Sequence, residues 1–363
     1  MKIGIIGTRG IPNHYGGFEQ FAEYLSSGLV KRGHEVTVYN SHDHPFKEKE
    51  WQGVNIMHCY DPEDILGTVG QFIYDFNCIL DSRKRDFDII LQLGYTSSSV
   101  WGWLLPRKKS IVTTNVDGLE WKRTKFSPKV KKFLKYAEQL GIKYSDYLIS
   151  DSIGIQDYLK NIYQKDSLYI PYGADLFMQP DNSCLKDYGV EELQFSMLIA
   201  RLEPENSIEM ILDGVVKANN NEKFLVIGKH ETKFGIYLKN KFRNQKNVIF
   251  VGGVYNINVL DNLRHYSRLY FHGHTVGGTN PSLLEAMASQ ALIAASRNVF
   301  NQSILEDDAF YFGNADEVSQ LLMNIDKPMY TGMLEANNNK ITQTFSWDRI
   351  IRQYEDHFKD ILI

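Results

Sequence analysis

The residues from Gly277 to Glu285, GGTNPSLLE, combine features that suit a phosphorylated ligand. Two glycines permit a tight turn, and Asn280 followed by Pro281 is typical of a helix start. A helix start presents backbone N–H groups to an anion. The carboxylate of Glu285, one turn further on, can accept hydrogen bonds from sugar hydroxyls. The same residues also fit an ordinary strand–turn–helix unit that exposes a glutamate, because glycine-rich turns are common.

Two cations stand where a second and third predicted strand end. Arg201 follows a strand predicted over 195–200, and its planar guanidinium suits a phosphate. Lys229 follows a strand predicted over 224–227 and one glycine. Lys229 is either a second cation that binds the phosphate or a surface lysine without a binding role.

Another glycine-rich loop, residues 9–17, lies between a strand predicted over 2–6 and a helix predicted over 18–31. A dinucleotide site is the first hypothesis for such a unit. However, the spacing of Gly4, Gly7 and Gly10 is not GxGxxG, and the next strand ends at Asn40, where an acid should meet ribose. A nicotinamide enzyme is therefore disfavoured.

Strands and helices alternate along the chain, which predicts an α/β fold with doubly wound parallel sheets. Ligands of such sheets bind beyond the carboxyl ends of the strands. The length of 363 residues suits two domains. Further strands are predicted over 35–39, 54–58, 88–93, 110–114, 147–150, 167–170, 248–251 and 269–271, and Asn337–Asn339 are predicted to form a loop.

Composition excludes several classes of protein. The net charge of −4 gives no reason to bind nucleic acid. The three scattered cysteines indicate reduced thiols in a cytoplasmic protein. The N-terminus leads directly into a strand, and there is no run of about 18 apolar residues. We expect a cytoplasmic protein that does not span a membrane.

The segment 121–136, WKRTKFSPKVKKFLKY, carries seven Lys or Arg residues and no acid. Val130, Phe133, Leu134 and Ala137 repeat at the spacing of one helical face, and Lys129, Lys131, Lys132 and Lys135 cover the rest. Such a helix either lies on an anionic membrane surface or packs its apolar face inward.

Two short patterns could suggest a metal, and we assign none to either. Asp86-Phe87-Asp88 precedes a strand instead of ending one. His272-Gly273-His274 has no evident third ligand, so its imidazoles are better interpreted as core or donor-site groups.

These motifs resemble those of retaining glycosyltransferases of the GT-B architecture, family-four type, in which two Rossmann-like domains face each other across a cleft. The resemblance covers essentially the whole chain and is strongest at GTRGIPNHYGGFE, NVDGLEWKR, ARLEPEN and HTVGGTNPSLLEAMA. It implies an acceptor domain over 1–172, a donor domain over 173–346, and a final helix over 347–363 that crosses back onto the first domain. The first and last motifs look most like a rhamnosyltransferase-like branch that builds bacterial surface polysaccharide.

The resemblance also implies residue roles. Glu285 matches the glutamate that binds the donor ribose, but the other glutamate of the family motif would fall at Gly277. Arg201 matches one cation of the diphosphate clamp, whereas the lysine of that clamp is replaced by Asn206, with Lys229 as a candidate substitute. The implied donor site comprises Gly16, Gly17, Arg201, Asn206, Lys229, Gly277, Gly278, Thr279, Asn280, Pro281, Ser282 and Glu285.

Asp117 stands where the family commonly has a histidine near the reacting sugar. We predict that Asp117 contacts the sugar or the acceptor and that Arg201 stabilises the leaving diphosphate; an Asx-turn cap is the alternative role for Asp117. The acceptor and membrane side is assigned to Glu120, Lys122, Arg123, Lys129 and Lys132.

The function expected from these features is transfer of a hexosyl group, with rhamnose favoured, from a nucleoside diphosphate sugar to a saccharide acceptor. The donor would carry thymidine or uridine, and the acceptor would be lipid-linked. No cofactor or metal is expected, and the protein could lie peripherally on the inner face of the membrane. The alternatives are a nucleotide-sugar epimerase of the same architecture and a non-catalytic carbohydrate-binding protein.

Overall fold

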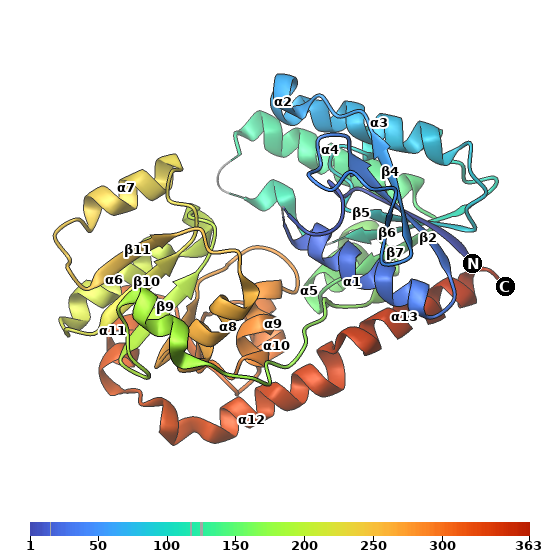
Figure 1. Cartoon of the computed structure of the whole chain (residues 1–363). Coiled ribbons are helices and arrows are strands. Elements are labelled where there is room, and N and C mark those ends of the chain that lie inside the picture. Colours follow the sequence, from blue (N-terminus) through green and yellow to red (C-terminus); the bar gives the residue numbers. More distant parts are fainter. Residues whose placement is uncertain (15, 117, 124–125) are drawn as a thin grey trace. The chain divides into compact units, whose positions relative to one another are not determined.

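The chain forms two compact units, which the computed structural model describes for residues 1–14, 16–116, 118–123 and 126–363 (Figure 1). Unit 1 comprises Met1–Trp121, Phe126–Gly173 and Trp347–Ile363. Unit 2 comprises Lys122–Lys125 and Ala174–Ser346. Each unit is an α/β structure built on its own sheet.

The sheet of unit 1, as far as its residues are described, has eight strands in the order β3-β4-β2-β1-β5-β6-β7-β8. All neighbours are parallel except β3 with β4. The central strands are mostly apolar and nearly all of their residues are buried, as expected for strands covered on both faces. The strands are β1 (Lys2–Ile6), β2 (Glu35–Ser41), β3 (Glu50–Trp51), β4 (Val54–Cys59), β5 (Ile89–Leu93), β6 (Ile111–Val116), β7 (Tyr147–Ser150) and β8 (Leu168–Tyr169).

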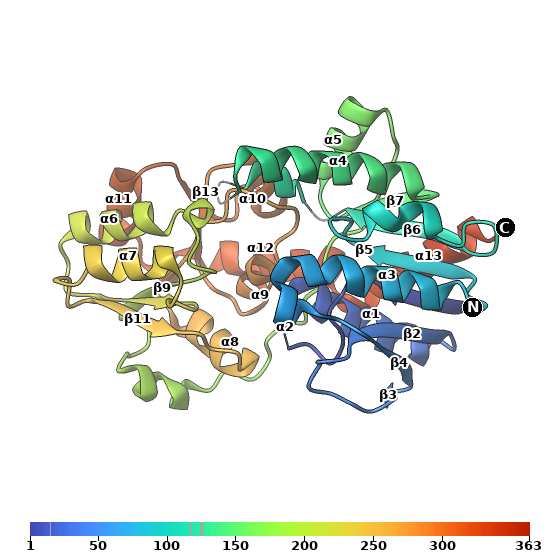
Figure 2. The same ribbon diagram turned by 90° about the horizontal axis from the view of Figure 1, so that it is seen from above.

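Helices cover both faces of this sheet. α3 and α4 lie over one face and α1 and α13 over the other (Figures 1 and 2). The helices are α1 (Gly17–Lys31), α2 (Glu63–Leu66), α3 (Gly70–Ser82), α4 (Pro128–Tyr144), α5 (Ile153–Tyr163) and α13 (Trp347–Ile361), with 3-10 turns η1 (Gly67–Val69), η2 (Ser99–Leu104) and η3 (Glu120–Lys122).

The sheet of unit 2 is parallel throughout its described residues, in the order β11-β10-β9-β12-β13-β14. Its strands are β9 (Phe195–Ile199), β10 (Lys223–Ile227), β11 (Val248–Gly252), β12 (Leu269–His272), β13 (Ile293–Ser296) and β14 (Phe310–Phe312). Its helices are α6 (Ile208–Ala218), α7 (Lys233–Lys241), α8 (Ile257–Tyr266), α9 (Pro281–Ala288), α10 (Val299–Leu305), α11 (Ala315–Asn324) and α12 (Thr331–Lys340), with η4 (Asn182–Tyr188), η5 (Pro204–Asn206), η6 (Lys327–Tyr330) and η7 (Ile341–Phe345).

Side-chain caps set where many helices begin. Asn280 accepts a hydrogen bond from the Ser282 N–H, and Ser127 accepts one from the Val130 N–H. Such caps satisfy N–H groups that have no partner inside the helix. The doubly wound α/β class predicted from strand alternation is confirmed, and most predicted strands lie within a residue or two of the observed ones.

The prediction of a loop at Asn337–Asn339 is wrong, because these residues lie in α12. Asparagine has a low helix propensity, but tertiary contacts override it here. The buried Asn337 amide donates to the Asp308 carbonyl at 2.8 Å, and Lys340 forms an ion pair with the Asp308 carboxylate at 2.8 Å. These contacts hold the helix against the end of α10.

Helix α13 packs on α1 of the same unit through aromatic and charged contacts. The Trp347 ring stacks on Tyr24 with centroids 4.4 Å apart. A Cβ added at Gly28 would lie 2.3 Å from the end of the Ile351 side chain, so a larger residue at position 28 would force Ile351 to shift. Glu355 accepts hydrogen bonds from Arg32 at 3.2 Å and His34 at 3.0 Å, and forms an ion pair with Lys359 at 2.7 Å.

The charges around Glu355 predict a pH-dependent contribution to stability. The hydrogen bond from Lys359 outweighs burial and, together with that from His34, lowers the pKa of Glu355 from 4.5 to about 2. A carboxyl group with a lowered pKa stabilises the fold above its unfolded pKa, and this contribution is lost as the pH falls toward the folded pKa. We expect Glu355→Gln to lower the free energy of unfolding at pH 6 by about 2 kcal/mol and by clearly less at pH 3, as measured by urea unfolding.

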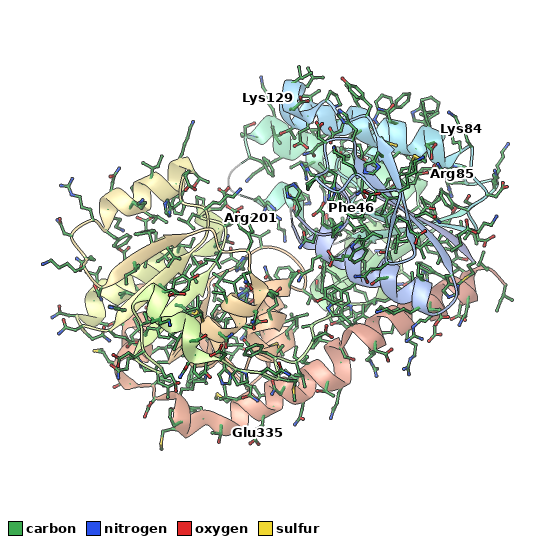
Figure 3. The ribbon with its side chains drawn as sticks, viewed as in Figure 1. Phe46, Lys84, Arg85, Lys129, Arg201 and Glu335 are labelled. Atoms are coloured by element: carbon green, nitrogen blue, oxygen red, sulfur yellow. The ribbon has the colours of Figure 1, made fainter. Side chains whose placement is uncertain are left out.

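Glu335 is a matched control, because it is an exposed glutamate on α12 (Figure 3). Glu335→Gln should change the stability by less than about 0.5 kcal/mol at either pH. If Glu355→Gln lowers the free energy of unfolding equally at pH 6 and pH 3, the charge of Glu355 does not contribute to stability as assigned.

Candidate functional site at the carboxyl edge of the second sheet

The candidate site begins where two neighbouring strands of unit 2 end. β9 and β12 are parallel neighbours, with Leu198 opposite Phe271. Arg201 follows β9 and is exposed at this edge (Figure 3). The loop that leads to α9 follows β12. The two segments that carry the predicted phosphate-binding groups therefore leave the sheet side by side.

Backbone contacts tie the two loops together. Thr275 donates to the Glu205 carbonyl from its N–H at 3.2 Å and from its hydroxyl at 2.7 Å. A Cβ added at Gly273 would lie 2.1 Å from the Asn206 carbonyl oxygen, so the crossing tolerates only glycine. The position of Arg201 relative to the loop after β12 is thus set by the packing of main chain on main chain.

Asn206, which stands at the clamp-lysine position of the resemblance, has a structural contact. It is buried, and its amide donates to the Arg201 carbonyl at 2.7 Å. Lys229 is exposed, with Nζ 5.7 Å from the centroid of the Tyr255 ring. Tyr255 follows β11, so Lys229 and Tyr255 lie at the same edge of the sheet as Arg201.

The start of α9 offers fewer N–H groups than the sequence suggests. Pro281 has none, and the Ser282 N–H donates to the Asn280 side chain at 2.9 Å. Gly277 has a φ of +126°, and a Cβ added there would meet no atom within 4 Å. Backbone contacts with an anion would therefore come from the loop Gly277–Asn280, in which Thr279 is buried, and not from the first helical turn.

Glu285 lies one turn into α9 and forms an ion pair with Arg264 at 2.6 Å. The Glu285 side chain is 18% exposed, so part of it is accessible to a ligand. The guanidinium of Arg264 is buried and also donates to Ser282 at 3.1 Å. The sequence did not predict a partner for Glu285. The sequence does contain a signal for a buried cation: Arg264 lies on the same helical face as the buried residues Leu260 and Leu263.

Two histidines stack beside this loop. The His272 and His274 ring centroids lie 4.4 Å apart with an angle of 18° between planes. Among the described residues, neither ring nitrogen of His272 nor Nδ1 of His274 has a hydrogen-bond partner. Burial, followed by the positive charges of Arg201 and Arg123, lowers the pKa of His274 to about 3. The imidazole of His274 is therefore neutral near pH 7. The described residues include no cluster of three His, Cys, Asp or Glu side chains that could hold a metal.

At the carboxyl edge of unit 1, Gly16 and Gly17 lie where α1 begins. Glu19 is buried and turns back to this loop, accepting hydrogen bonds from the Arg9 N–H at 2.9 Å and from the Thr8 hydroxyl at 3.3 Å. Glu19 therefore shapes the loop.

Arg9 donates to Glu63 at 2.9 and 3.0 Å. Although burial opposes it, the hydrogen bonds from Arg9 and Gln71 hold the pKa of Glu63 below its usual range. Close to this group, the buried carboxyl of Asp75 accepts a hydrogen bond from Ser97 at 2.5 Å, and burial raises the pKa of Asp75 to about 7. No sequence motif pointed to Asp75, although an acid among the apolar residues of FIYDFNCIL is a usable signal of a buried carboxyl.

Asp117 lies outside the described residues, so its predicted role stays a prediction from sequence. The residues that follow it are held by the buried Glu138 of α4. Glu138 accepts a hydrogen bond from the Trp121 indole at 3.0 Å. The Tyr95 hydroxyl lies within hydrogen-bond distance of two groups, the Glu138 carboxylate at 3.3 Å and the Gly118 carbonyl at 3.1 Å. Glu138 therefore anchors the loop after β6. Glu120 is half-buried on this loop.

The basic segment divides in a way that the sequence did not predict. Lys129 and Lys132 are exposed on α4, whereas Lys122 and Arg123 group with unit 2. Lys135 was expected on the outer face, but its Nζ forms an ion pair with Glu138 at 2.8 Å and lies 4.5 Å from the Trp121 ring centroid. Val130, the first residue of the predicted apolar face, is 40% exposed. The buried carboxylate of Glu138 draws Lys135 inward, and α4 packs mainly through its later turns.

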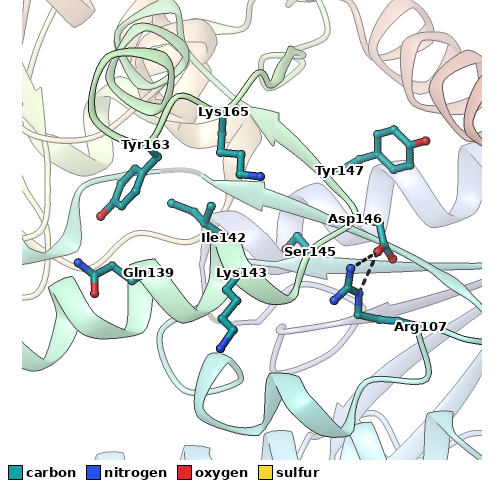
Figure 4. A pocket seen from close by; sticks show the side chains of 9 residues that line it. All are labelled: Arg107, Gln139, Ile142, Lys143, Ser145, Asp146, Tyr147, Tyr163 and Lys165. Atoms are coloured by element: carbon teal, nitrogen blue, oxygen red, sulfur yellow. Dashed lines mark hydrogen bonds and ion pairs between the residues drawn. The ribbon is translucent and has the colours of Figure 1, made fainter.

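A pocket of about 660 Å³ lies elsewhere in unit 1 (Figure 4). It lies where α4 ends and β7 begins, at the amino edge of the sheet. Ligands of parallel sheets bind at the opposite edge. Asp146 in this pocket is already bound to Arg107, whose Nε donates at 2.9 Å. The lining residues are Arg107, Gln139, Ile142, Lys143, Ser145, Asp146, Tyr147, Tyr163 and Lys165.

Comparisons with known proteins agree with this architecture. Residues 1–175 match a family model described as "Domain of unknown function (DUF1972)". No curated protein matches the chain. Among solved structures, the sucrose-phosphate synthase of Thermosynechococcus elongatus is 15% identical with a TM-score of 0.81, and the match covers 99% of this chain and 98% of that one.

Two other solved structures are similar over the same extent. HepE of Anabaena, in complex with UDP and glucose, is 15% identical with a TM-score of 0.77, covering 99% of this chain and 100% of that one. An Escherichia coli structure, described as trehalose-6-phosphate bound with UDP-2-fluoro glucose, is 11% identical with a TM-score of 0.71, covering 99% and 98%. Identities this low establish the fold alone. The chain has the GT-B fold, built from two Rossmann-like domains.

Proposed function

We propose that this protein is a retaining glycosyltransferase that transfers a hexosyl group, with rhamnose favoured, from a nucleoside diphosphate sugar to a saccharide acceptor in polysaccharide synthesis. The proposed donor domain is 173–346, and the proposed acceptor domain is 1–172 together with 347–363. One observation carries the proposal: Arg201 and the Gly277–Glu285 segment lie at adjacent strand ends of one parallel sheet, joined by Thr275 and Glu205. That edge is where such sheets bind nucleotides.

The structural neighbours support the choice of ligand. The HepE structure is a complex with UDP and glucose, and the E. coli structure is bound with UDP-2-fluoro glucose. By analogy, the donor of this chain would carry uridine or thymidine.

The proposed chemistry needs stabilisation of the charge on the departing diphosphate. Arg201 would donate to the phosphate oxygens, aided by N–H groups of the loop Gly277–Asn280. Lys229 is the candidate second cation. The Glu285 carboxylate would accept hydrogen bonds from the ribose hydroxyls. The neutral imidazole of His274 can donate one hydrogen bond without adding charge. In this proposal the leaving phosphate takes the acceptor proton, and neither a cofactor nor a metal takes part. Asp117 would contact the sugar or the acceptor, and Glu120 would lie on the acceptor and membrane side.

Binding of nucleoside diphosphates tests the donor site. A panel of UDP, dTDP, GDP and ADP should include one that stabilises the protein in thermal unfolding, by about 2.7 kcal/mol at a hundredfold excess over Kd. Arg201→Ala should weaken that binding at least about tenfold, because a hydrogen bond to a charged group contributes about 1.5–3 kcal/mol. Glu285→Ala should weaken it as well.

Arg243 is the matched control. It is exposed in the turn between α7 and β11, at the amino edge of the sheet. Arg243→Ala should leave nucleotide binding unchanged. If no nucleoside diphosphate stabilises the wild type, the transferase assignment fails. If binding survives both Arg201→Ala and Glu285→Ala, the site lies elsewhere.

We further propose that the protein is cytoplasmic and lies peripherally on an anionic membrane, where it would meet a lipid-linked acceptor. Lys129, labelled in Figure 3, is exposed at the start of α4, and Lys132 on the same helix is exposed as well. On the same unit, Ile65, Leu66 and Val69 form an apolar tip over α2 and η1, with exposed fractions of 73%, 48% and 62%. Exposed apolar groups together with basic ones suit a lipid surface. No helix among the described residues is both long and apolar enough to cross a bilayer.

Vesicle sedimentation tests this surface. The protein should sediment with vesicles that contain phosphatidylglycerol, not with pure phosphatidylcholine, and salt of about 0.5 M should release it. Because each lysine near an anionic surface contributes about 1 kcal/mol, Lys129→Glu combined with Lys132→Glu should reduce partitioning at least about thirtyfold.

The control carries the same substitutions on α7, at the exposed Lys233 and Lys239. These changes should leave sedimentation unchanged. Equal binding to neutral and anionic vesicles, or equal losses for the two pairs of variants, would argue against α4 as the membrane surface.

A further inference from the structure

Arg264 is a buried cation with contacts to two helices and one strand. It lies near the end of α8 and is 1% exposed. One arm of its guanidinium donates to Asp261 at 2.8 Å, and the other donates to Glu285 at 2.6 Å and to Ser282 at 3.1 Å. The carbon of the guanidinium lies 5.9 Å from the centroid of the Tyr270 ring.

Burying a guanidinium is costly unless it is paired and hydrogen-bonded. The pairing here is asymmetric. Asp261 lies on the same helix as Arg264, three residues earlier, whereas Glu285 and Ser282 lie on α9. Tyr270 of β12 completes the group, because its hydroxyl is 3.0 Å from that of Ser282. The fork of Arg264 therefore joins α8 to Ser282 and Glu285 of α9, two residues that the sequence assigns to the donor site.

We infer that Arg264 is a positioning residue for nucleotide recognition: it holds the carboxylate of Glu285 in the orientation that accepts hydrogen bonds from the donor ribose. The inference rests on the proposed function, because it takes Glu285 as the ribose-binding group. It adds a second residue, 21 positions away in sequence, on which recognition of the ribose hydroxyls depends.

Geometry explains why a guanidinium is needed. Arginine presents a rigid planar fork that can contact Asp261 on one side and Glu285 on the other. The ammonium of lysine is a single point charge on a flexible stem. A lysine at position 264 keeps the charge but cannot hold both carboxylates in fixed directions. Glu285 would then keep its charge and lose its orientation.

The test measures how strongly the protein prefers ribose hydroxyls. Whichever of UDP and dTDP stabilises the wild type more is compared with its 2′,3′-dideoxy counterpart, and the ratio of the two Kd values is determined by calorimetry at pH 8. Glu285→Gln should lower this ratio by about tenfold or more. Arg264→Lys should lower it to a similar extent, and the double variant should lower it no further, because both residues act through one carboxylate.

Arg268→Lys is the control. Arg268 is a largely buried arginine that donates to Glu222 through Nε at 2.9 Å, but it precedes β12 at the amino edge of the sheet. Its substitution should lower stability and leave the ratio within about twofold of the wild type, as expected for a residue remote from the site. A loss of hydroxyl preference in Arg264→Lys and not in Arg268→Lys supports positioning.

If Arg264→Lys does not fold, Arg264→Met combined with Asp261→Asn keeps the net charge of the cluster, since one cation and one anion are removed. Replacement of a buried ion pair by groups of similar size is often tolerated. The same loss of hydroxyl preference is expected. If the folded Arg264 variants keep the full preference for ribose hydroxyls while Glu285→Gln loses it, the inference about Arg264 is wrong and the proposed function still stands. Absence of any nucleotide binding by the wild type would overturn the proposed function and the inference with it.

Discussion

The parallel pairing of β9 with β12 is the constraint on which the candidate site depends. These strands are about 70 residues apart in the chain, yet Met197 lies opposite Tyr270 and Leu198 opposite Phe271. All of these side chains are buried, so a shift of register by one residue would reverse which face each contacts. The register therefore determines which residues leave the sheet together, and here they are Arg201 and the glycine-rich loop before α9.

At this edge of the sheet, close contacts between main-chain segments hold the loops after β9 and β12 together. Gly273 passes the Asn206 carbonyl at a distance that no side chain tolerates, and Thr275 binds the neighbouring Glu205 carbonyl. Asn206 is engaged with the Arg201 carbonyl. The Asn206 side chain thus holds the loop that carries Arg201. Preorganised groups of this kind are effective because little reorganisation is needed when charge develops.

Buried charges in this protein join elements that are distant in sequence. Glu138 holds the loop after β6, Glu355 binds α13 to α1, and Arg264 joins α8 to α9. Each is surrounded by several donors or acceptors, as burial of a charge requires. Loss of one partner leaves the other charge buried without compensation. Such groups therefore favour a single arrangement of the loops and helices that they contact.

The sequence by itself determined the class of fold, the order of the elements and the segments that could bind a phosphate. An apolar run that ends at a glycine, such as the one before Gly273, is a local pattern that predicts a strand and the point where it ends. In parallel sheets the carboxyl ends of the strands form the edge where ligands bind. The strand order, the partner of Glu285 and the environment of Lys135 depend on contacts between residues far apart in the chain. Periodicity placed Lys135 on an outer face, but the buried Glu138 carboxylate attracts its ammonium inward. Only tertiary structure decides such cases, because the energy of a charge depends on which groups surround it and not on its position along a helix.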